Sequence, residues 1–380
     1  MAGYTVTVIG LGKVGFPLAC YLAGLGHTVI GYDSKREVVD YLNSSENPMP
    51  WEPGVKASSL KLITSSLTVA TASSESFFIA VPTPVERHNY LSGEIVERIL
   101  RDLARLAPTK LRIIMSTLDP RTAAHVCSGR LTVYAPPLVR LGSVIEDLTR
   151  PPLLMVGGID SVLMQQATDL LHNGFPQFGV VHSDPTTIAL AKLAINVTLS
   201  AKAAWANEVA ELAQRLGAKS EVVADILGLD PRIGPAFMQP GWPPSGPCLP
   251  RDLVAWCSLY RKAALPYSLA LAVRASHARI KEICLGDLIS QITDLSKGSQ
   301  PKVGVIGLNY RQGVPSSEGT IAHELINLGR PRGWHILGED LGPGTQAFVD
   351  SCSIIVLASG EVPDDIDFKG KDVIVVRPKV

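Results

Sequence analysis

Short apolar runs alternate with longer segments of helical periodicity through the first half of the chain. The runs cover residues 6–9, 28–32, 77–81, 112–115, 153–156 and 178–181, and most of them end at a glycine, a proline or a polar residue. Runs of this length, separated by helical stretches, are typical of buried strands in a parallel sheet joined by crossover helices. The pattern therefore predicts an α/β domain over residues 1–185.

The pattern changes at Asp184. Asp184 or Thr186 could cap a long helix that carries Pro185 in its first turn and extends to about residue 216. Apolar residues occupy most faces of this segment, so we expect it to be buried between domains or subunits. Further helical segments extend to about residue 292, and residues 186–295 are predicted to form a central helical domain.

A polar segment over residues 296–301 is predicted to be a linker. After it come a strand-like run that ends in a glycine turn (303–308), a helical segment (321–328) and two strand-like runs (354–358 and 373–376). This order predicts a second, smaller α/β domain over residues 300–380.

Composition narrows the possible functions. The chain has 380 residues, 46% of them hydrophobic, and equal numbers of basic and acidic residues, 35 each. Without a basic run, we expect neither nucleic acid nor an anionic membrane as a partner. Lys13 and several glycines interrupt the apolar N-terminus, which lacks a cationic leader, and no uninterrupted apolar stretch is long enough to span a bilayer. The six cysteines show no CxxC spacing, which favours reduced thiols in a cytoplasm and no metal site.

The first strand–helix–strand segment carries a dinucleotide-binding motif. Gly10, Gly12 and Gly15 have the GxGxxG spacing, which allows a tight turn, a close approach to a pyrophosphate and close helix–strand packing. Asp33 ends the second strand, where its carboxylate can bind a ribose 2′-hydroxyl and would repel a 2′-phosphate. We therefore predict NAD as the cofactor, although Arg36 and its basic neighbour weaken the preference over NADP slightly. The alternative is a glycine-rich turn that only packs.

Two more turns should lie beside this motif. Pro82-Thr83 and Ser116-Thr117 follow strand-like runs, and ligands collect at the carboxyl ends of parallel strands. The glycine turn at residue 307 lacks the full motif and has no acidic residue at the matching spacing, so we expect it to serve packing or another nucleotide. The expected cofactor-binding residues are Gly10, Gly12, Lys13, Val14, Gly15, Asp33, Arg36, Pro82, Thr83 and Thr117.

Cys248 is the cysteine best suited to chemistry. It lies in a Gly/Pro-rich loop four residues before Asp252, whereas the other five cysteines are expected to be structural. Thiolates are the nucleophilic form, and nearby cations favour them. A buried structural cysteine remains the alternative for Cys248.

Lys192 and Asn196 form a second cluster. They are four residues apart on the predicted long helix and therefore share one face, among apolar neighbours. A lysine in such surroundings must extend to solvent, form an ion pair or take part in chemistry.

Together with further motifs, these residues make the chain resemble the UDP-glucose/GDP-mannose dehydrogenase family. The resemblance covers nearly the whole chain, and its motifs occur in the family's order: GLGKVGFPLA (10–19), GHTVIGYD (26–33), EPG (52–54), VPTP (81–84), ST (116–117), GSVIEDL (142–148), the K-x-x-x-N helix that ends in ANE (206–208), LDPRIGPAF (229–237) and CLPRD (248–252). It implies an N-terminal Rossmann domain, a central helical dimerisation domain and a smaller C-terminal Rossmann-like domain that helps to hold the nucleotide.

The resemblance also implies roles for single residues. Cys248 would attack an aldehyde, and a second hydride transfer would turn the thiohemiacetal into a thioester. Lys192 and Asn196 would hold the developing oxyanion. Asp252 would act with Lys192 through water as general base, and Thr117 would order that water and the cofactor. The implied substrate-binding residues are Arg140, Lys192, Asn196, Arg232 (reaching into the neighbouring subunit's site), Phe237, Gly246 and Cys248.

Several positions depart from the family pattern. Residues 135–142 read APPLVRLG where the family has N-P-E-F-L-x-E-G, so Pro137 and Leu141 replace two glutamates. The first glutamate is credited with a base role in thioester turnover. Pro247 replaces a serine and removes a backbone N–H beside Cys248. Glu318 stands where the family has a substrate-binding arginine.

Three functions remain open from the sequence. The first is an NAD-dependent oxidoreductase that oxidises the carbinol of a nucleotide-sugar. The second is a redox-neutral dehydratase or epimerase of secondary metabolism, which would oxidise an unusual nucleotide-sugar transiently and return the hydride. The third, a silent nucleotide-sugar-binding protein, fits least well because Lys192, Asn196, Cys248 and Asp252 are all retained. In each case we expect a cytoplasmic homodimer or a larger homo-oligomer.

Overall fold

The chain forms two compact units in a computed structural model. The structure describes residues 3–45, 47–86, 90–172, 178–266, 268–298, 300–311, 313–358, 363 and 365–376. The first unit is Met1–Ala194 and the second is Ile195–Val380. The division into three domains at residues 185 and 295–300 stays a prediction, because this two-unit division does not test it.

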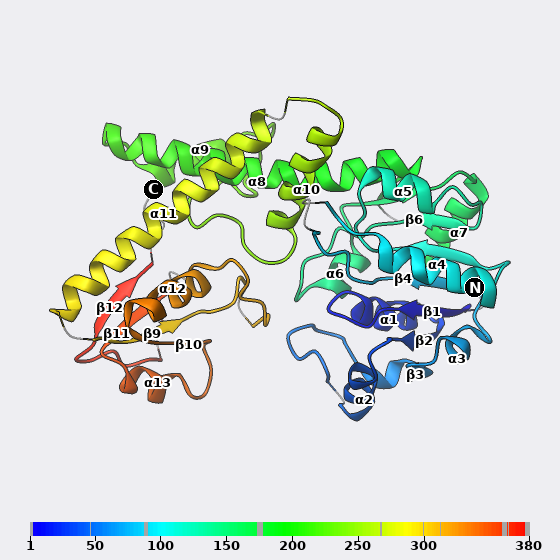
Figure 1. The fold of residues 1–380 in the computed structure, drawn as a ribbon, viewed down its shortest axis with the longest axis horizontal. Coiled ribbons are helices and arrows are strands. Elements are labelled where there is room, and N and C mark those ends of the chain that lie inside the picture. The colour runs from blue at the N-terminus through cyan, green and yellow to red at the C-terminus, as the bar shows by residue number, and fades with distance from the viewer. Residues whose placement is uncertain are drawn as a thin grey trace. The chain divides into compact units, whose positions relative to one another are not determined.

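The first unit is built on an eight-stranded sheet in the order β3-β2-β1-β4-β5-β6-β7-β8. Figure 1 labels β1, β2, β3, β4 and β6 of this sheet. Every neighbouring pair is parallel except β6 and β7. The strands are β1 Thr5–Ile9, β2 Thr28–Tyr32, β3 Leu62–Thr64, β4 Ser76–Ile79, β5 Leu111–Ile114, β6 Thr132–Tyr134, β7 Leu153–Gly157 and β8 Gly179–Ser183. The order reverses between β1 and β4, as in a Rossmann fold, and ligands bind at that reversal.

Helices flank this sheet, and its central strands are buried on both faces. The helices are α1 Gly15–Gly24, α2 Arg36–Ser44, η1 Ala57–Ser59, α3 Leu67–Thr71, α4 Glu94–Leu106, α5 Pro120–Val126, α6 Val144–Thr149 and α7 Ser161–His172. Phe77, Phe78 and Ile79 of β4 have no exposed surface. Burial on both faces explains why these strands were visible as continuous apolar runs in the sequence.

All six strands predicted for this unit are confirmed to within two residues. The pattern missed β3 and β6, which have three residues each and are too short to show a periodicity. It also could not give direction: β7 runs antiparallel to β6 and pairs with it at Tyr134 and Gly157, so β7 approaches this edge of the sheet from the opposite direction to β1, β4 and β5.

The second unit combines long helices with a four-stranded parallel sheet in the order β10-β9-β11-β12. Helix α8, Pro185–Leu216, begins in the first unit and continues into the second. The other elements are α9 Ser220–Leu229, α10 Leu249–Lys262, α11 Ser268–Ser296, β9 Lys302–Ile306, α12 Ile321–Gly329, η2 Arg330–Arg332, β10 His335–Glu339, α13 Thr345–Ser351, β11 Ile354–Leu357 and β12 Asp372–Val375 (Figure 1). Leu285, Leu288 and Ile292 of α11 pack in one core with β9, β11 and α12.

The glycine turn at residue 307 does bind an acid, although not at the sequence spacing that separates Gly10 from Asp33. Gly307 has φ +90°, close to the +92° of Gly10. Leu308 N–H donates to the Asp340 carboxylate at 2.8 Å, as Leu11 N–H donates to Asp33 at 2.9 Å. The acid is farther along the chain because the segment 308–320 intervenes. The turn still differs from the first one, because the Thr320 side chain caps α12 by accepting His323 N–H at 3.2 Å.

Helix α8 bears on the expectation that no apolar stretch is long enough to span a bilayer. Among the described residues it is the one helix that, by length and composition alone, could cross a membrane, with a most apolar window of mean hydropathy 1.2. Buried core helices pass the same test, and a third of that window, 33%, is buried. The length and composition of this helix therefore fit a core helix as well as a membrane-spanning helix.

Candidate active site

The glycine motif forms a turn that fits a pyrophosphate. A side chain on Gly10 would lie 2.6 Å from the carbonyl oxygen of Ala80, and one on Gly15 would lie 1.8 Å from that of Gly10. A Cβ on Gly12 would meet nothing within 4 Å, so packing does not explain this glycine. The open approach lies beside the start of α1, whose N-cap residue Val14 provides no side-chain cap. Uncapped N–H groups at a helix N-terminus favour an anion, and the turn therefore fits the phosphates of NAD.

Asp33 is held where a ribose would lie. Its two carboxylate oxygens accept the N–H groups of Leu11 at 2.9 Å and Lys35 at 3.0 Å. Gly10 N–H donates to the carbonyl of Tyr32 at 2.8 Å, so the end of β2 is fixed against the turn. Lys13, Lys35 and Arg36 are exposed nearby in sequence, and Arg36 is 3.8 Å from Asp40. The negative charge at this place favours a cofactor with a free 2′-hydroxyl.

The turns after β4 and β5 lie level with the glycine turn. Ile9, Ile79 and Ile114 are in register, so all three strands end at one edge of the sheet. The hydroxyl of Ser116 accepts Val81 N–H at 2.9 Å and donates to Val81 O at 2.8 Å, which ties the two turns together. Thr83 is buried, Thr117 is half-buried and Pro82 is exposed. The predicted cofactor residues thus share one edge of the sheet.

We expect Asp33→Ala to weaken NAD binding roughly ten- to a hundredfold, as expected for lost hydrogen bonds to a charged group. The NADP affinity should fall less, because the same change removes a repulsive charge, so the preference for NAD narrows. Titration of both cofactors measures this. Asp340→Ala is the matched control, since Asp340 has the equivalent place in the second unit and should leave NAD binding unchanged. Equal affinity of the unmodified protein for NADP and NAD would contradict the assignment.

Lys192 lies in the first unit with its charge buried. It is 8% exposed, and its ammonium donates to the carbonyl oxygen of Pro137 at 2.7 Å. Pro137 is the position at which the family pattern has a glutamate. A main-chain carbonyl accepts the same hydrogen bond but carries no charge and cannot take a proton.

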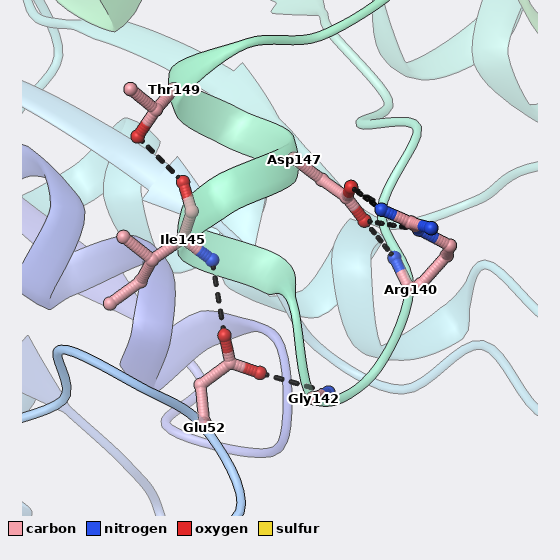
Figure 2. A network of polar contacts seen from close by, with 6 residues as sticks. All are labelled: Glu52, Arg140, Gly142, Ile145, Asp147 and Thr149. Carbon is pink, nitrogen blue, oxygen red and sulfur yellow. Dashed lines mark hydrogen bonds and ion pairs between the residues drawn. The ribbon is translucent and has the colours of Figure 1, made fainter. Parts of the chain in front are cut away.

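The segment 137–145 is fixed by two carboxylates, as Figure 2 shows. Asp147 accepts the backbone N–H of Arg140 at 2.7 Å and its guanidinium at 2.6 Å. Glu52 accepts the N–H groups of Gly142 at 2.9 Å and Ile145 at 3.2 Å. Burial raises the pKa of Glu52, while the backbone N–H groups act in the opposite direction. Arg140, an expected substrate residue, is therefore engaged by Asp147 in this structure.

The second unit brings Asn196, Cys248 and Asp252 together. Cys248 is the N-cap residue of α10 and is exposed, and Asp252 lies one turn later with no exposed surface. Asp252 accepts the amide N–H of Asn196 at 2.6 Å and the guanidinium of Arg251 at 2.8 Å. A thiol at a helix N-terminus is in a setting that stabilises a thiolate.

The loop before Cys248 is held by the segment 308–320. Gly246 N–H donates to the carbonyl of Glu318 at 2.9 Å, and the indole of Trp242 donates to the carbonyl of Gly319 at 2.9 Å. Gly246 has φ +81°, and a Cβ there would lie 3.1 Å from the ring of Tyr310. Burial and the neighbouring Cys248 raise the pKa of Tyr310. Glu318 thus supports this loop through its backbone.

The other cysteines have the structural character expected of them. Cys20, Cys127, Cys257 and Cys352 are buried and Cys284 is half-buried. Burial raises the pKa of Cys127 to about 12, which keeps it a thiol. No group of His, Cys, Asp and Glu suited to a metal ion occurs in the part of the chain that the structure describes.

Arg232 and Phe237 lie together on an exposed loop after α9. The Arg232 side chain is 87% exposed and pairs with Asp230 at 2.6 Å. Phe237 is 40% exposed and has φ +63°, a conformation that costs a bulky residue energy. Lys202 of α8 fixes this loop by donating to the carbonyl oxygens of Ile233 at 2.9 Å and Gly234 at 3.1 Å.

Sequence reasoning missed four residues of this site. The structure adds Glu52, Arg251, Tyr310 and Asp147 to the residues that hold the expected ones. Arg251 was visible inside the CLPRD motif as a basic neighbour of Asp252. Glu52 and Asp147 were visible only as parts of motifs of the family (EPG and GSVIEDL), and Tyr310 had no signal of its own.

Comparison with known proteins places the chain in a family. The family model described as the NAD binding domain of the UDP-glucose/GDP-mannose dehydrogenase family matches residues 4–174, and the central-domain model of the same family matches residues 186–278. The chain is 28% identical over 356 residues to UDP-glucose 6-dehydrogenase of Rhizobium meliloti, which covers 88% of this chain and 81% of that protein. It is 24% identical to GDP-mannose 6-dehydrogenase of Pseudomonas aeruginosa, over 87% of this chain and 80% of that protein.

A solved structure agrees with these matches. The UDP-glucose dehydrogenase of the archaeon Pyrobaculum islandicum superposes with a TM-score of 0.81 at 25% identity, over 99% of this chain and 95% of that one. Two domain models of one family match in the family's order, and the relatives match over most of their length. The glycine turn that fits the phosphates of NAD agrees with both findings. The chain therefore belongs to the UDP-glucose/GDP-mannose dehydrogenase family, as a divergent NAD-dependent member.

Proposed function

We propose that this enzyme oxidises the CH2OH carbon of the sugar in a UDP- or GDP-linked hexose to a carboxylate, with Cys248 as nucleophile. The observation that carries the proposal is the group in the second unit in which Asp252, fully buried, binds Asn196 at 2.6 Å one turn after the exposed Cys248. A purely structural cysteine needs neither exposure nor a helix N-terminus.

The residues of the chain divide the chemistry between them. NAD, when bound, accepts hydride from the sugar carbon. The ammonium of Lys192 and the amide of Asn196 donate to the oxygen on which negative charge develops, and such preorganised donors lower the barrier. Asp252, acting with Lys192 through water, takes the proton of the hydroxyl group. Thr117, at the end of β5, orders that water against the cofactor.

Cys248 is needed only once an aldehyde exists. Its thiolate adds to the aldehyde carbon, and the resulting thiohemiacetal loses a second hydride to give a thioester. Water then cleaves the C–S bond, which releases the carboxylate and returns the thiol. In total one alcohol, two NAD+ and one water give one carboxylate, two NADH and three protons.

The substrate assignment is tested by incubating the enzyme with NAD and a panel of UDP- and GDP-sugars. Absorbance reports NADH, and mass spectrometry identifies the product. Two NADH for each uronate formed would support the proposal. Without net NADH, loss of one water from the sugar would instead identify a redox-neutral dehydratase, and an isomer of unchanged mass would identify an epimerase.

We further propose a homodimer formed through α9 and the end of α8. Large apolar side chains are exposed there: Leu212 is 60%, Leu216 74%, Ile226 62% and Leu229 83% exposed. Covering apolar surface stabilises by about 25 cal/mol per Å². Arg232 of one subunit would then reach the site of its partner. We expect the enzyme to act in the cytoplasm, without a membrane or nucleic-acid partner.

We expect Ile226→Glu to convert the protein into a monomer and to reduce its activity, because a charge in the interface opposes association and Arg232 then leaves the partner's site. Light scattering and a rate assay measure the two effects. Val162→Glu on α7, where the valine is 73% exposed, is the matched control and should change neither. An active monomer of the unmodified protein would contradict both the dimer and the role of Arg232.

A further inference from the structure

Glu52 is a buried charge for which the proposed mechanism has no use. It is 3% exposed and lies in the turn after α2, in the EPG motif. Among the described residues, none of the ion pairs of the structure includes Glu52. Burying a carboxylate without a cation costs free energy, so we expect Glu52 and its hydrogen bonds to have a structural or functional role.

Those hydrogen bonds reach a distant segment of the chain. Each carboxylate oxygen of Glu52 accepts one backbone N–H of this distant segment, from Gly142 at 2.9 Å and from Ile145 at 3.2 Å (Figure 2). Gly142 has φ +84°, which a residue with a side chain rarely adopts, and a Cβ on Gly54 would lie 3.4 Å from Ile145. Charge-assisted bonds to two backbone donors fix a segment more firmly than neutral ones do.

The fixed segment carries the acceptor for Lys192. Residues 137–145 lead from the carbonyl of Pro137, 2.7 Å from the Lys192 ammonium, to the N–H groups that Glu52 accepts. Arg140 and Asp147 hold the middle of the segment to α6. Two consecutive prolines, Pro136 and Pro137, restrict its backbone further. The position of the carbonyl therefore depends on where the rest of the segment is anchored.

We propose that Glu52 is a positioning residue for Lys192, acting by anchoring the 137–145 segment whose Pro137 carbonyl holds the ammonium. The catalytic importance of Lys192 rests on the proposed function, whereas the anchoring does not. A displacement of about 1 Å in a catalytic group can cost as much as a hundredfold in rate, so a loosened anchor should be visible in turnover.

Glu52→Gln tests this with little change in size. The glutamine keeps one oxygen acceptor but turns an NH2 group toward either Gly142 or Ile145, where two donors repel. We expect kcat to fall roughly tenfold or more, with the Kd for NAD unchanged. Acetylation of Lys192 by acetic anhydride, followed by peptide mass spectrometry without turnover, should become severalfold faster because the ammonium is released.

Asp160→Asn is the matched control. Asp160 caps α7 by accepting the N–H groups of Val162 at 3.0 Å and Leu163 at 3.3 Å. It pairs with Arg130 at 2.8 Å, which precedes β6, so it lies near the amino end of that strand, whereas the candidate site lies at the carboxyl ends. The substitution removes a charge but keeps an oxygen that can cap the helix, so we expect kcat and the acetylation of Lys192 to stay as in the unmodified enzyme.

The outcomes separate the possibilities. Glu52→Gln with unchanged kcat and unchanged acetylation of Lys192 overturns the proposal, and so does an equal loss of kcat in Asp160→Asn. If Glu52→Gln fails to fold, Glu52→Asp serves instead, because it keeps the charge but cannot reach both donors, and it should change both readouts in the same direction. If Lys192→Ala proves fully active, the proposed function fails while the acetylation still reports on the anchor.

Discussion

Lys192→Ala is expected to abolish the first hydride transfer. An alkoxide that develops in a site of low polarity needs a positioned donor, and loss of one donor typically slows the reaction roughly a hundredfold to a thousandfold. Lys192 is 8% exposed, so water cannot easily take its place. Single-turnover formation of NADH, followed by absorbance after enzyme, NAD and substrate are mixed, measures this step directly.

The control should remove a similar hydrogen bond elsewhere. Lys371 donates to the main-chain oxygens of Asp350 at 2.8 Å and Cys352 at 2.7 Å in the second unit, as Lys192 does to Pro137. Lys371→Ala should leave hydride transfer unchanged. Near-normal single-turnover transfer in Lys192→Ala would show that this lysine only extends along the helix surface, and the proposed mechanism would lose its main donor.

Substitution of Cys248 is expected to separate the two enzyme classes. In a four-electron dehydrogenase, Cys248→Ser should stall at the aldehyde or at an ester-like adduct, with the second NADH lost. In a redox-neutral enzyme no thioester forms, so Cys248→Ala should keep substantial turnover. The place of Cys248 at the N-cap of α10, one turn before the buried Asp252, favours the first result.

The measurement combines the number of NADH formed per substrate with intact mass spectrometry. A covalent adduct on Cys248, trapped from the unmodified enzyme with its substrate, would support the dehydrogenase. Cys284→Ala is the control, because Cys284 is half-buried on α11 and burial raises the pKa of its thiol. Full activity of Cys248→Ala would rule out the thioester.

The departures at Pro137 and Leu141 bear on the same experiment. At the first position, the main-chain carbonyl oxygen of Pro137 lies 2.7 Å from the Lys192 ammonium. At the second, the side chain of Leu141 is buried. Neither can accept a proton from water. If the dehydrogenase reading holds, thioester hydrolysis must depend on Asp252 and Lys192, and it should be slow relative to the two hydride transfers. A burst of NADH before steady state would reveal this.

Much of the fold could be predicted from the sequence. The turn from β1 through Gly10 to Asp33 was predictable because one continuous βαβ unit contains every residue of it, and its glycine spacing and strand-end acid follow from local geometry. The six longer strands of the first unit were predictable because burial on both faces leaves a continuous apolar run, and the long helix over 185–216 was predictable from its start at Pro185 and its helical pattern. The placing of Asn196 and Lys192 on one helix face follows from helical periodicity alone.

Contacts between distant segments were decided by the tertiary structure. Glu52 meets Gly142 and Ile145 only because the turn after α2 packs against the start of α6, and a linear motif records neither partner. Asp340 takes the place of Asp33 in the second unit, yet the longer segment between Gly307 and α12 hides it from a search at fixed spacing. The short strands β3 and β6 and the reversed β7 depend on pairing with neighbours. Local sequence sets the backbone periodicity of each segment, whereas the faces that pack together decide which side chains and backbone groups meet.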